Sequence, residues 1–117
     1  MQLGHNSGTP DAEGIAHELS KRGHAWADTH AAAQAFEEAQ KSVLAEVAAD
    51  YRQTGTKSQT EAEGLARANK KYRDFVVEMV EARRIANRAR VNFDTYKVWI
   101  ELIRTKAATE RAQMNLR

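Results

Sequence analysis

The amino-acid sequence predicts an all-α protein: a long antiparallel helical hairpin with coiled-coil packing that oligomerises into a bundle. Apolar residues recur every three or four positions along the second half of the 117-residue chain. A short stretch of turn-forming residues separates this half from an alanine-rich first half. The chain has one Pro and six Gly, so little interrupts helix formation in either half. The expected domain is one hairpin over residues 11–117.

The composition excludes several classes of protein. The chain has no Cys, which removes disulfides, thiolate nucleophiles and cysteine-ligated zinc or iron–sulfur sites. A mean hydropathy of −0.69 and the absence of a long apolar run argue against a membrane span. The first residues do not combine a basic region with an apolar stretch, so no secretory signal is expected. We therefore expect a cytoplasmic protein without membrane contact.

The first ten residues are rich in turn-forming and polar residues. Gly, Asn, Ser, Thr and the single Pro cluster in residues 1–10. Such a segment cannot bury enough apolar surface to offset its ordering entropy. We expect a flexible tail here, with a short docking peptide as the alternative.

A first helix is expected over residues 11–53. Asp11 is suited to the N-cap position. The larger apolar residues, with one alanine, fall on one helical face: Ile15, Leu19, Trp26, Ala33, Phe36, Val43 and Val47. Gly23 costs about 1 kcal/mol relative to Ala inside a helix, so a kink or break is expected near residues 20–25.

A turn is expected over residues 54–60, followed by a second helix over residues 61–115. Gly55 is suited to the left-handed position that ends a helix. Thr60 and Glu63 match a capping box directly before the next apolar run.

The second helix carries a continuous apolar seam. Alternating steps of three and four reach fifteen positions, of which fourteen are apolar or aromatic. The positions are Leu65, Ala68, Tyr72, Phe75, Met79, Ala82, Ala86, Ala89, Phe93, Tyr96, Ile100, Ile103, Ala107, Glu110 and Met114. This 3.5-residue period is typical of a coiled coil. The central alanines leave space that Trp26 and Phe36 of the first helix are expected to fill.

Further apolar residues lie off the seam and predict a homo-oligomer. They are Val76, Val80, Ile85, Val98, Trp99 and Leu102. A second apolar stripe indicates that more than two helices meet, because soluble monomers rarely expose such a surface. The residues expected at the oligomer interface are Tyr72, Phe75, Met79, Phe93, Tyr96, Trp99, Ile100 and Ile103.

Catalysis is not expected. The four His, at positions 5, 17, 24 and 30, lack the spacing of a helical metal site. No Ser lies in a nucleophile motif and no phosphate-binding loop is present. Neighbouring carboxylates have Lys or Arg one turn away, which favours surface ion pairs. We expect no cofactor, no metal and no enzymatic activity.

Charge divides unequally between the two halves. Residues 1–60 contain five basic and eight acidic residues, whereas residues 61–117 contain thirteen and eight. The candidate binding residues for nucleic acid or an acidic partner are Lys70, Lys71, Arg73, Arg83, Arg84, Arg88 and Arg90. Arginines bind phosphate bidentately, so single-stranded DNA is a possible ligand. The alternative is that Arg83–Arg90 pair with acids of the first helix.

The chain from about residue 57 to residue 114 resembles a family of small phage and prophage proteins. The resemblance rests on Thr60–Glu63, the pair Tyr72–Arg73, Glu81–Arg83 and the ending Arg104–Met114. Gly4–Gly8 also resembles a leader seen on phage-derived proteins of alphaproteobacteria. Members are mostly uncharacterised helical proteins encoded near recombination and single-strand annealing genes.

This resemblance implies an accessory role in phage DNA recombination or replication inside a bacterial host cell, for example as a recombination mediator. We expect a non-enzymatic helical oligomer that binds single-stranded DNA, a recombinase, or both. Two alternatives stay open. The chain is a protein–protein adaptor or inhibitor of a host factor, including a host defence, or it is a structural or scaffolding phage component.

Overall fold

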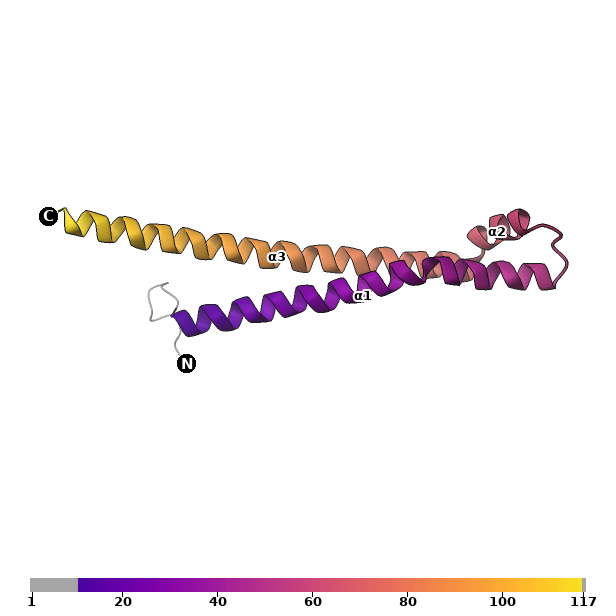
Figure 1. The fold of residues 1–117 in the computed structure, drawn as a ribbon, viewed down its shortest axis with the longest axis horizontal. Helices are drawn as coiled ribbons and strands as arrows, with labels where there is room; N and C mark the ends of the chain where they lie inside the picture. Colours follow the sequence, from indigo (N-terminus) through magenta and orange to yellow (C-terminus); the bar gives the residue numbers. More distant parts are fainter. Residues whose placement is uncertain (1–10, 117) are drawn as a thin grey trace. The chain divides into compact units, whose positions relative to one another are not determined.

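The computed structural model describes residues 11–116, which form three helices and no strand: α1 (Ala12–Gln53), α2 (Gln59–Ala68) and α3 (Lys70–Asn115) (Figure 1). The all-α fold class and the helical hairpin are confirmed. The tail expected over residues 1–10 lies outside the described residues.

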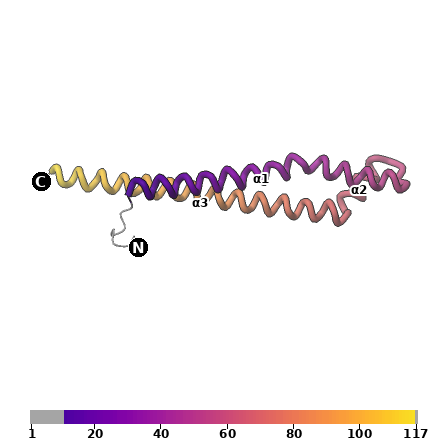
Figure 2. Tube along the Cα trace, turned by 90° about the horizontal axis from the view of Figure 1, so that it is seen from below, coloured from indigo at the N-terminus to yellow at the C-terminus, as the bar shows by residue number. Residues whose placement is uncertain are grey.

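The described chain divides into two compact units. Unit 1 combines the chain up to Trp26 with the chain from Arg88 onward, and unit 2 is Ala27–Asn87. Within each unit a stretch of α1 lies beside a stretch of α3 (Figures 1 and 2). The physical reason for two units is that each stretch of a long helix pair contacts only the stretch opposite it.

The start of α1 follows the prediction, but its interior does not. Asp11 caps the helix, because its side chain accepts a hydrogen bond from the Gly14 amide. The helix then continues unbroken to Gln53, so the break predicted near Gly23 is wrong. A Cβ added to Gly23 would lie 3.3 Å from Cε1 of Phe93. The glycine permits this close approach, which explains why it is tolerated inside the helix.

Gly55 ends α1, as the sequence predicts. Its φ is +114°, a conformation that side chains other than hydrogen rarely allow. The Thr56 amide donates to the Tyr51 carbonyl at 3.1 Å, and the Gly55 amide donates to the Arg52 carbonyl at 3.3 Å. These two bonds form a Schellman motif that satisfies the last carbonyls of the helix.

The start of α2 differs from the prediction by two residues. Ser58 is the N-cap, and its hydroxyl accepts a hydrogen bond from the Glu61 amide at 3.1 Å. The capping box predicted at Thr60 and Glu63 is therefore wrong. Two overlapping Ser/Thr-x-x-Glu patterns are present in the sequence, and the helix uses the earlier one.

The single helix expected over residues 61–115 is divided at Asn69. This residue has a ψ of 140° and ends α2. Its side-chain oxygen accepts from the Lys71 amide at 2.8 Å, which caps α3, and its side-chain nitrogen donates to the Tyr51 hydroxyl at 3.0 Å. At the end of α2 the Asn69 backbone amide donates to the Ala66 carbonyl at 3.0 Å, so this one residue serves both helix ends and is tied to α1.

The division at Asn69 also interrupts the apolar seam. Leu65 is 42% exposed, although the heptad count places it on the seam. Ala62 and Ala66 are completely buried in its place. The face that α2 buries is therefore not the one that the α3 heptad count predicts. The predicted heptad positions are wrong before residue 70.

From Tyr72 to Ala107 the predicted seam is confirmed. Each of its residues in this stretch is buried or half-buried: Tyr72, Phe75, Met79, Ala82, Ala86, Ala89, Phe93, Tyr96, Ile100, Ile103 and Ala107. Between residues 70 and 107, only Val76 and Arg83 are similarly shielded at positions off the seam. The apolar face predicted on α1 is likewise buried or half-buried from Ile15 to Val47.

The core of unit 2 is built by all three helices. Val47 and Ala48 of α1 meet Ala62 and Ala66 of α2 and Tyr72 of α3. The small residues allow the helix backbones to approach closely, and the Tyr72 ring fills the space between them. The Tyr72 hydroxyl accepts a hydrogen bond from the Gln40 side-chain amide at 3.0 Å.

Candidate binding surfaces

The predicted basic residues divide into paired and unpaired groups. Arg83 belongs to the first group, because its guanidinium donates two 2.8 Å hydrogen bonds to the Glu37 carboxylate. A third nitrogen of Arg83 lies 3.1 Å from Nδ1 of His30. All three residues lie in unit 2, where this cluster joins α1 to α3. The alternative that the sequence left open, pairing with the first helix, is therefore observed at Arg83.

Electrostatics at this cluster favour the charged forms. The hydrogen bond from Arg83 lowers the pKa of the Glu37 carboxyl, and the positive guanidinium adds to this effect. The same hydrogen bond raises the pKa of Arg83. Arg83 and Glu37 thus act as an ion pair between the two helices.

Two further basic residues pair along their own helix. Arg84 donates hydrogen bonds of 2.9 Å and 2.6 Å to the Glu81 carboxylate. Lys70 lies 2.6 Å from the Asp74 carboxylate. These exposed neighbours neutralise both cations locally.

The remaining four basic residues are exposed and form no ion pair within the described chain: Lys71 and Arg73 in unit 2, and Arg88 and Arg90 in unit 1. Arg88 has no acidic residue three or four positions away. Asp94, which lies one turn after Arg90, instead pairs with Lys97 at 3.3 Å. Because no acidic side chain of the described residues pairs with them, these four cations are available to contact an anionic ligand.

The helices of unit 1 pack through aromatic rings and cations. Trp26 of α1 stacks on Phe93 of α3 with ring centroids 6.3 Å apart. The Arg22 guanidinium lies 4.6 Å from the centroid of Tyr96, and the Lys97 ammonium lies 4.4 Å from that of Phe93. Trp26 therefore packs on an aromatic residue of the α3 seam.

Phe36 follows the same pattern in unit 2. Its ring lies 5.6 Å from that of Phe75, so it also packs against an aromatic residue instead of the alanines. Ala33 and Ala86 are both almost completely buried. Small residues on both helices thus allow close approach, and no large side chain is needed between them.

Most of the residues predicted at the oligomer interface pack inside the chain itself. Seven of them lie on the seam and are buried or half-buried within the chain: Tyr72, Phe75, Met79, Phe93, Tyr96, Ile100 and Ile103. Trp99 differs from these, since it is 38% exposed and stacks on Tyr96 at 5.2 Å. The structure thus gives the seven seam residues a role inside the hairpin.

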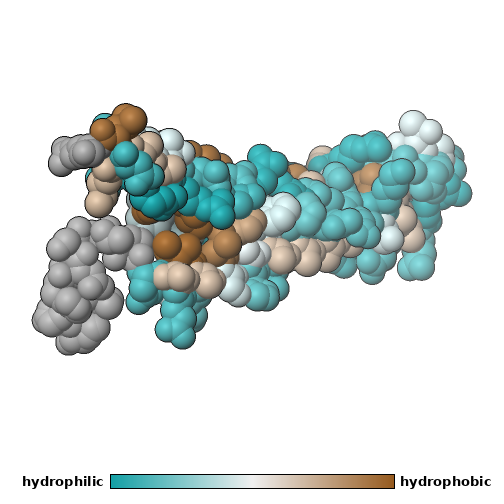
Figure 3. Space-filling model, turned by 60° about the vertical axis from the view of Figure 1, so that its left-hand side comes forward, coloured by the Kyte–Doolittle hydropathy of each residue, from teal (hydrophilic) through white to brown (hydrophobic). Residues whose placement is uncertain are grey.

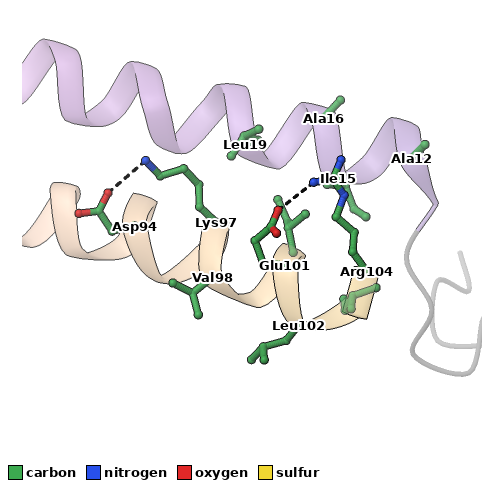
Figure 4. A pocket seen from close by; sticks show the side chains of 12 residues that line it. Ala12, Ile15, Ala16, Leu19, Asp94, Lys97, Val98, Glu101, Leu102 and Arg104 are labelled. Carbon is green, nitrogen blue, oxygen red and sulfur yellow. Dashed lines mark hydrogen bonds and ion pairs between the residues drawn. The ribbon is translucent and has the colours of Figure 1, made fainter. Parts of the chain in front are cut away.

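Other large apolar side chains remain exposed on α3. In unit 1 they include Val91 (55%), Val98 (59%) and Leu102 (64%). Val98 and Leu102 point from the side of α3 turned away from α1 (Figure 4). Apolar surface is visible at the end of the molecule where α1 begins (Figure 3). Val80 and Ile85 of unit 2, also expected off the seam, are exposed as well.

An apolar groove of about 970 Å³ lies on unit 1. Its aliphatic lining includes Ile15, Leu19, Val98, Ile100, Leu102 and Ile103. Its charged rim consists of two ion pairs along α3, Lys97–Asp94 at 3.3 Å and Arg104–Glu101 at 2.8 Å (Figure 4).

Residues 11–116 contain no group of three His, Asp or Glu side chains that could hold a metal ion. In the same part of the chain, no helix has the length and apolar character required to cross a membrane. His5 lies outside this range.

The comparisons with known proteins return no match: no family model, no curated protein and no solved structure is similar to the chain.

Sequence reasoning missed three residues that shape these surfaces. Arg22 donates to the Asn92 carbonyl at 3.3 Å and covers Tyr96, a role that no spacing rule indicates. Asn69 caps α3 and also donates a hydrogen bond to the Tyr51 hydroxyl. Gly23 signals a close approach, and a glycine on the apolar face of a helix could have been interpreted in this way.

Proposed function

We propose that this chain is a non-enzymatic phage accessory protein of DNA recombination or replication that binds the phosphate backbone of single-stranded DNA. The observation that supports this most is the pair Arg88 and Arg90, which is exposed and lacks ion pairs although acids are abundant elsewhere on the helices. The phage context and the single-stranded ligand rest on the sequence resemblance.

Backbone contact is the mode that suits these residues. Arginine forks bind phosphate oxygens without reading base identity. The paired residues Arg83 and Arg84 contribute less, because a phosphate would have to displace Glu37 or Glu81. Two free arginines per chain give weak binding, with a slope of log K against log salt of about −1.4 for a single strand.

A second candidate function is binding of a recombinase or another protein. The exposed residues Val98, Trp99 and Leu102 favour it, because such a row of apolar side chains is typical of an interaction surface. Binding through this surface would respond little to salt, in contrast to binding through phosphates.

The test is binding of labelled single-stranded and double-stranded oligonucleotides to the full chain over a salt series. We expect salt-sensitive binding to the single strand, lost in the double variant Arg88→Gln/Arg90→Gln. The matched control is Lys41→Gln/Lys57→Gln, which removes two exposed charges elsewhere and should retain binding.

Equal loss of binding in both double variants would show only a general charge effect and would contradict the assignment to Arg88 and Arg90. Absence of binding at low salt would remove the DNA proposal. A salt-insensitive complex with a purified single-strand annealing recombinase would then support the second candidate.

A further inference from the structure

The outer face of α3 in unit 1 carries a second regular row of uncharged residues. Alternating steps of four and three from Val91 reach seven exposed positions. We call this row the outer stripe: Val91, Thr95, Val98, Leu102, Thr105, Thr109 and Ala112. Exposed helix faces are ordinarily charged, so a row of three heptads without a charge is unusual.

The outer stripe ends where unit 1 ends. The same steps continued toward the N-terminus reach Arg88, Arg84 and Glu81, all of which are charged. The row is therefore a property of one part of α3 and not of the whole helix. Its spacing is that of a coiled-coil seam, which fits a straight partner helix alongside.

The apolar residues of the outer stripe are exposed in unit 1. Val91 is 55%, Val98 59% and Leu102 64% exposed. Val98 and Leu102 lie on the side of α3 opposite its seam with α1, so the hairpin itself does not cover them (Figure 4). A further helix packed along the outer stripe would bury this apolar surface.

Charges beside the outer stripe identify the occupant. On a helical wheel, Asp94 and Glu101 flank one edge of the stripe, and Trp99 and Lys106 flank the other. If a second α3 lies parallel to the first, Glu101 of each copy faces Lys106 of the other, and symmetry makes this attractive pair twice. If it lies antiparallel, the edge with Asp94 and Glu101 faces its own copy, and like charges oppose each other.

We propose that the outer stripe binds a second copy of this chain, with the two α3 helices parallel. The inference goes beyond the DNA proposal, because self-association is measured without DNA.

The first test is the mass of the full chain in solution by sedimentation equilibrium, over a concentration series. We expect a dimer of twice 13.1 kDa. The double variant Val98→Glu/Leu102→Glu places carboxylates in the contact and should raise the dimer Kd by more than about 100-fold. Both side chains are exposed, so the helical circular dichroism of the variant should be unchanged.

The matched control is Val77→Glu/Val80→Glu, which changes two exposed valines of unit 2 and should leave the dimer intact. A wild-type chain that stays monomeric at every concentration would overturn the proposal and leave the stripe for another protein. A dimer that persists in Val98→Glu/Leu102→Glu would overturn it as well.

The second test determines orientation. Because the chain has no Cys, the single variant Leu102→Cys carries one thiol. In a parallel pair the two introduced thiols lie opposite each other, so mild oxidation should link the dimer covalently. A dimer that fails to link at this position would contradict the parallel arrangement.

Discussion

The two compact units bury the apolar residues between their helices to different extents. Unit 2 adds α2 to the pair of α1 and α3, so three helices surround a core around Tyr72. Unit 1 has two helices, and its seam residues remain half-exposed. The difference shows that the heptad pattern of α3 buries a large ring such as Tyr72 where α2 adds a third helix, whereas the large seam residues of unit 1 stay half-buried.

Polar contacts show the same contrast. In unit 2 the Asn69 and Gln40 side chains donate hydrogen bonds to tyrosine hydroxyls, and Arg83 donates two hydrogen bonds to the Glu37 carboxylate. In unit 1, Arg22 of α1 donates a 3.3 Å hydrogen bond to the Asn92 carbonyl of α3 and lies over the Tyr96 ring. Unit 2 therefore has a more specific alignment of its helices, and unit 1 is better suited to accept a partner.

The largest expected effect comes from removing the central ring of unit 2. Tyr72→Ala should lower the free energy of unfolding by about 3 kcal/mol, because the ring is buried and its cavity cannot close. Trp99→Ala in unit 1, where the ring is 38% exposed, should cost about 1 kcal/mol or less. Urea unfolding of both variants measures the contrast, and equal losses would contradict it.

A second comparison uses two helical glycines. Gly64→Ala should stabilise the chain by about 1 kcal/mol, since nothing lies within 4 Å of the added methyl group. Gly23→Ala should give none of this gain, because its methyl group meets the Phe93 ring at 3.3 Å. Thermal unfolding of both variants tests this, and a full gain in Gly23→Ala would show that Trp26 and Phe93 are not tightly packed.

The ion pair of Arg83 and Glu37 in unit 2 predicts a pH dependence of stability. The pKa of Glu37 is lower in the folded chain than in the unfolded one, so the carboxylate stabilises the fold above its unfolded pKa. This contribution disappears as pH falls through the folded pKa. The difference in melting temperature between wild type and Glu37→Gln should thus be present at pH 7 and shrink at acid pH.

If that difference stays constant from pH 7 to the acid limit, the ion pair does not stabilise the fold. Glu38→Gln is the matched control, because this neighbour is exposed and forms no ion pair within the described chain. Its melting temperature should follow the wild type at each pH.

The smallest expected effect on stability is at the free arginines. Arg88→Gln/Arg90→Gln should change the free energy of unfolding by less than about 0.5 kcal/mol, because both side chains are exposed and unpaired. A much larger loss in urea unfolding would mean that these residues support the fold, which would weaken their assignment to a ligand.

The sequence predicts what depends on local periodicity and misses what depends on tertiary partners. The seam from Tyr72 to Ala107 follows from spacing alone, since a helix places these residues on one face. The break at Asn69 does not, because Leu65 and Ala68 match the heptad count by coincidence. The Asn69 cap also donates a hydrogen bond to the Tyr51 hydroxyl, a tertiary contact that no local pattern indicates.

The candidate site shows the same limit. Sequence composition identifies the basic residues but cannot separate Arg83, which faces Glu37, from Arg88, which faces solvent. Separating the two arginines requires knowing which residues of α1 lie opposite each residue of α3. If α1 were shifted by one heptad along α3, a different residue of α3 would face Glu37. The exposure of Val98, Trp99 and Leu102 was predictable, because these residues lie off a seam that already accounts for the hairpin.

The central claim is that unit 1 is completed by a second copy whereas unit 2 is complete by itself. Hydrogen–deuterium exchange of the full chain at low and high protein concentration tests this most directly. We expect amides of residues 91–112 to exchange more slowly at high concentration, while those of residues 33–51 and 62–86 exchange at unchanged rates. Exchange independent of concentration throughout, or slowed equally in both units, would contradict the account.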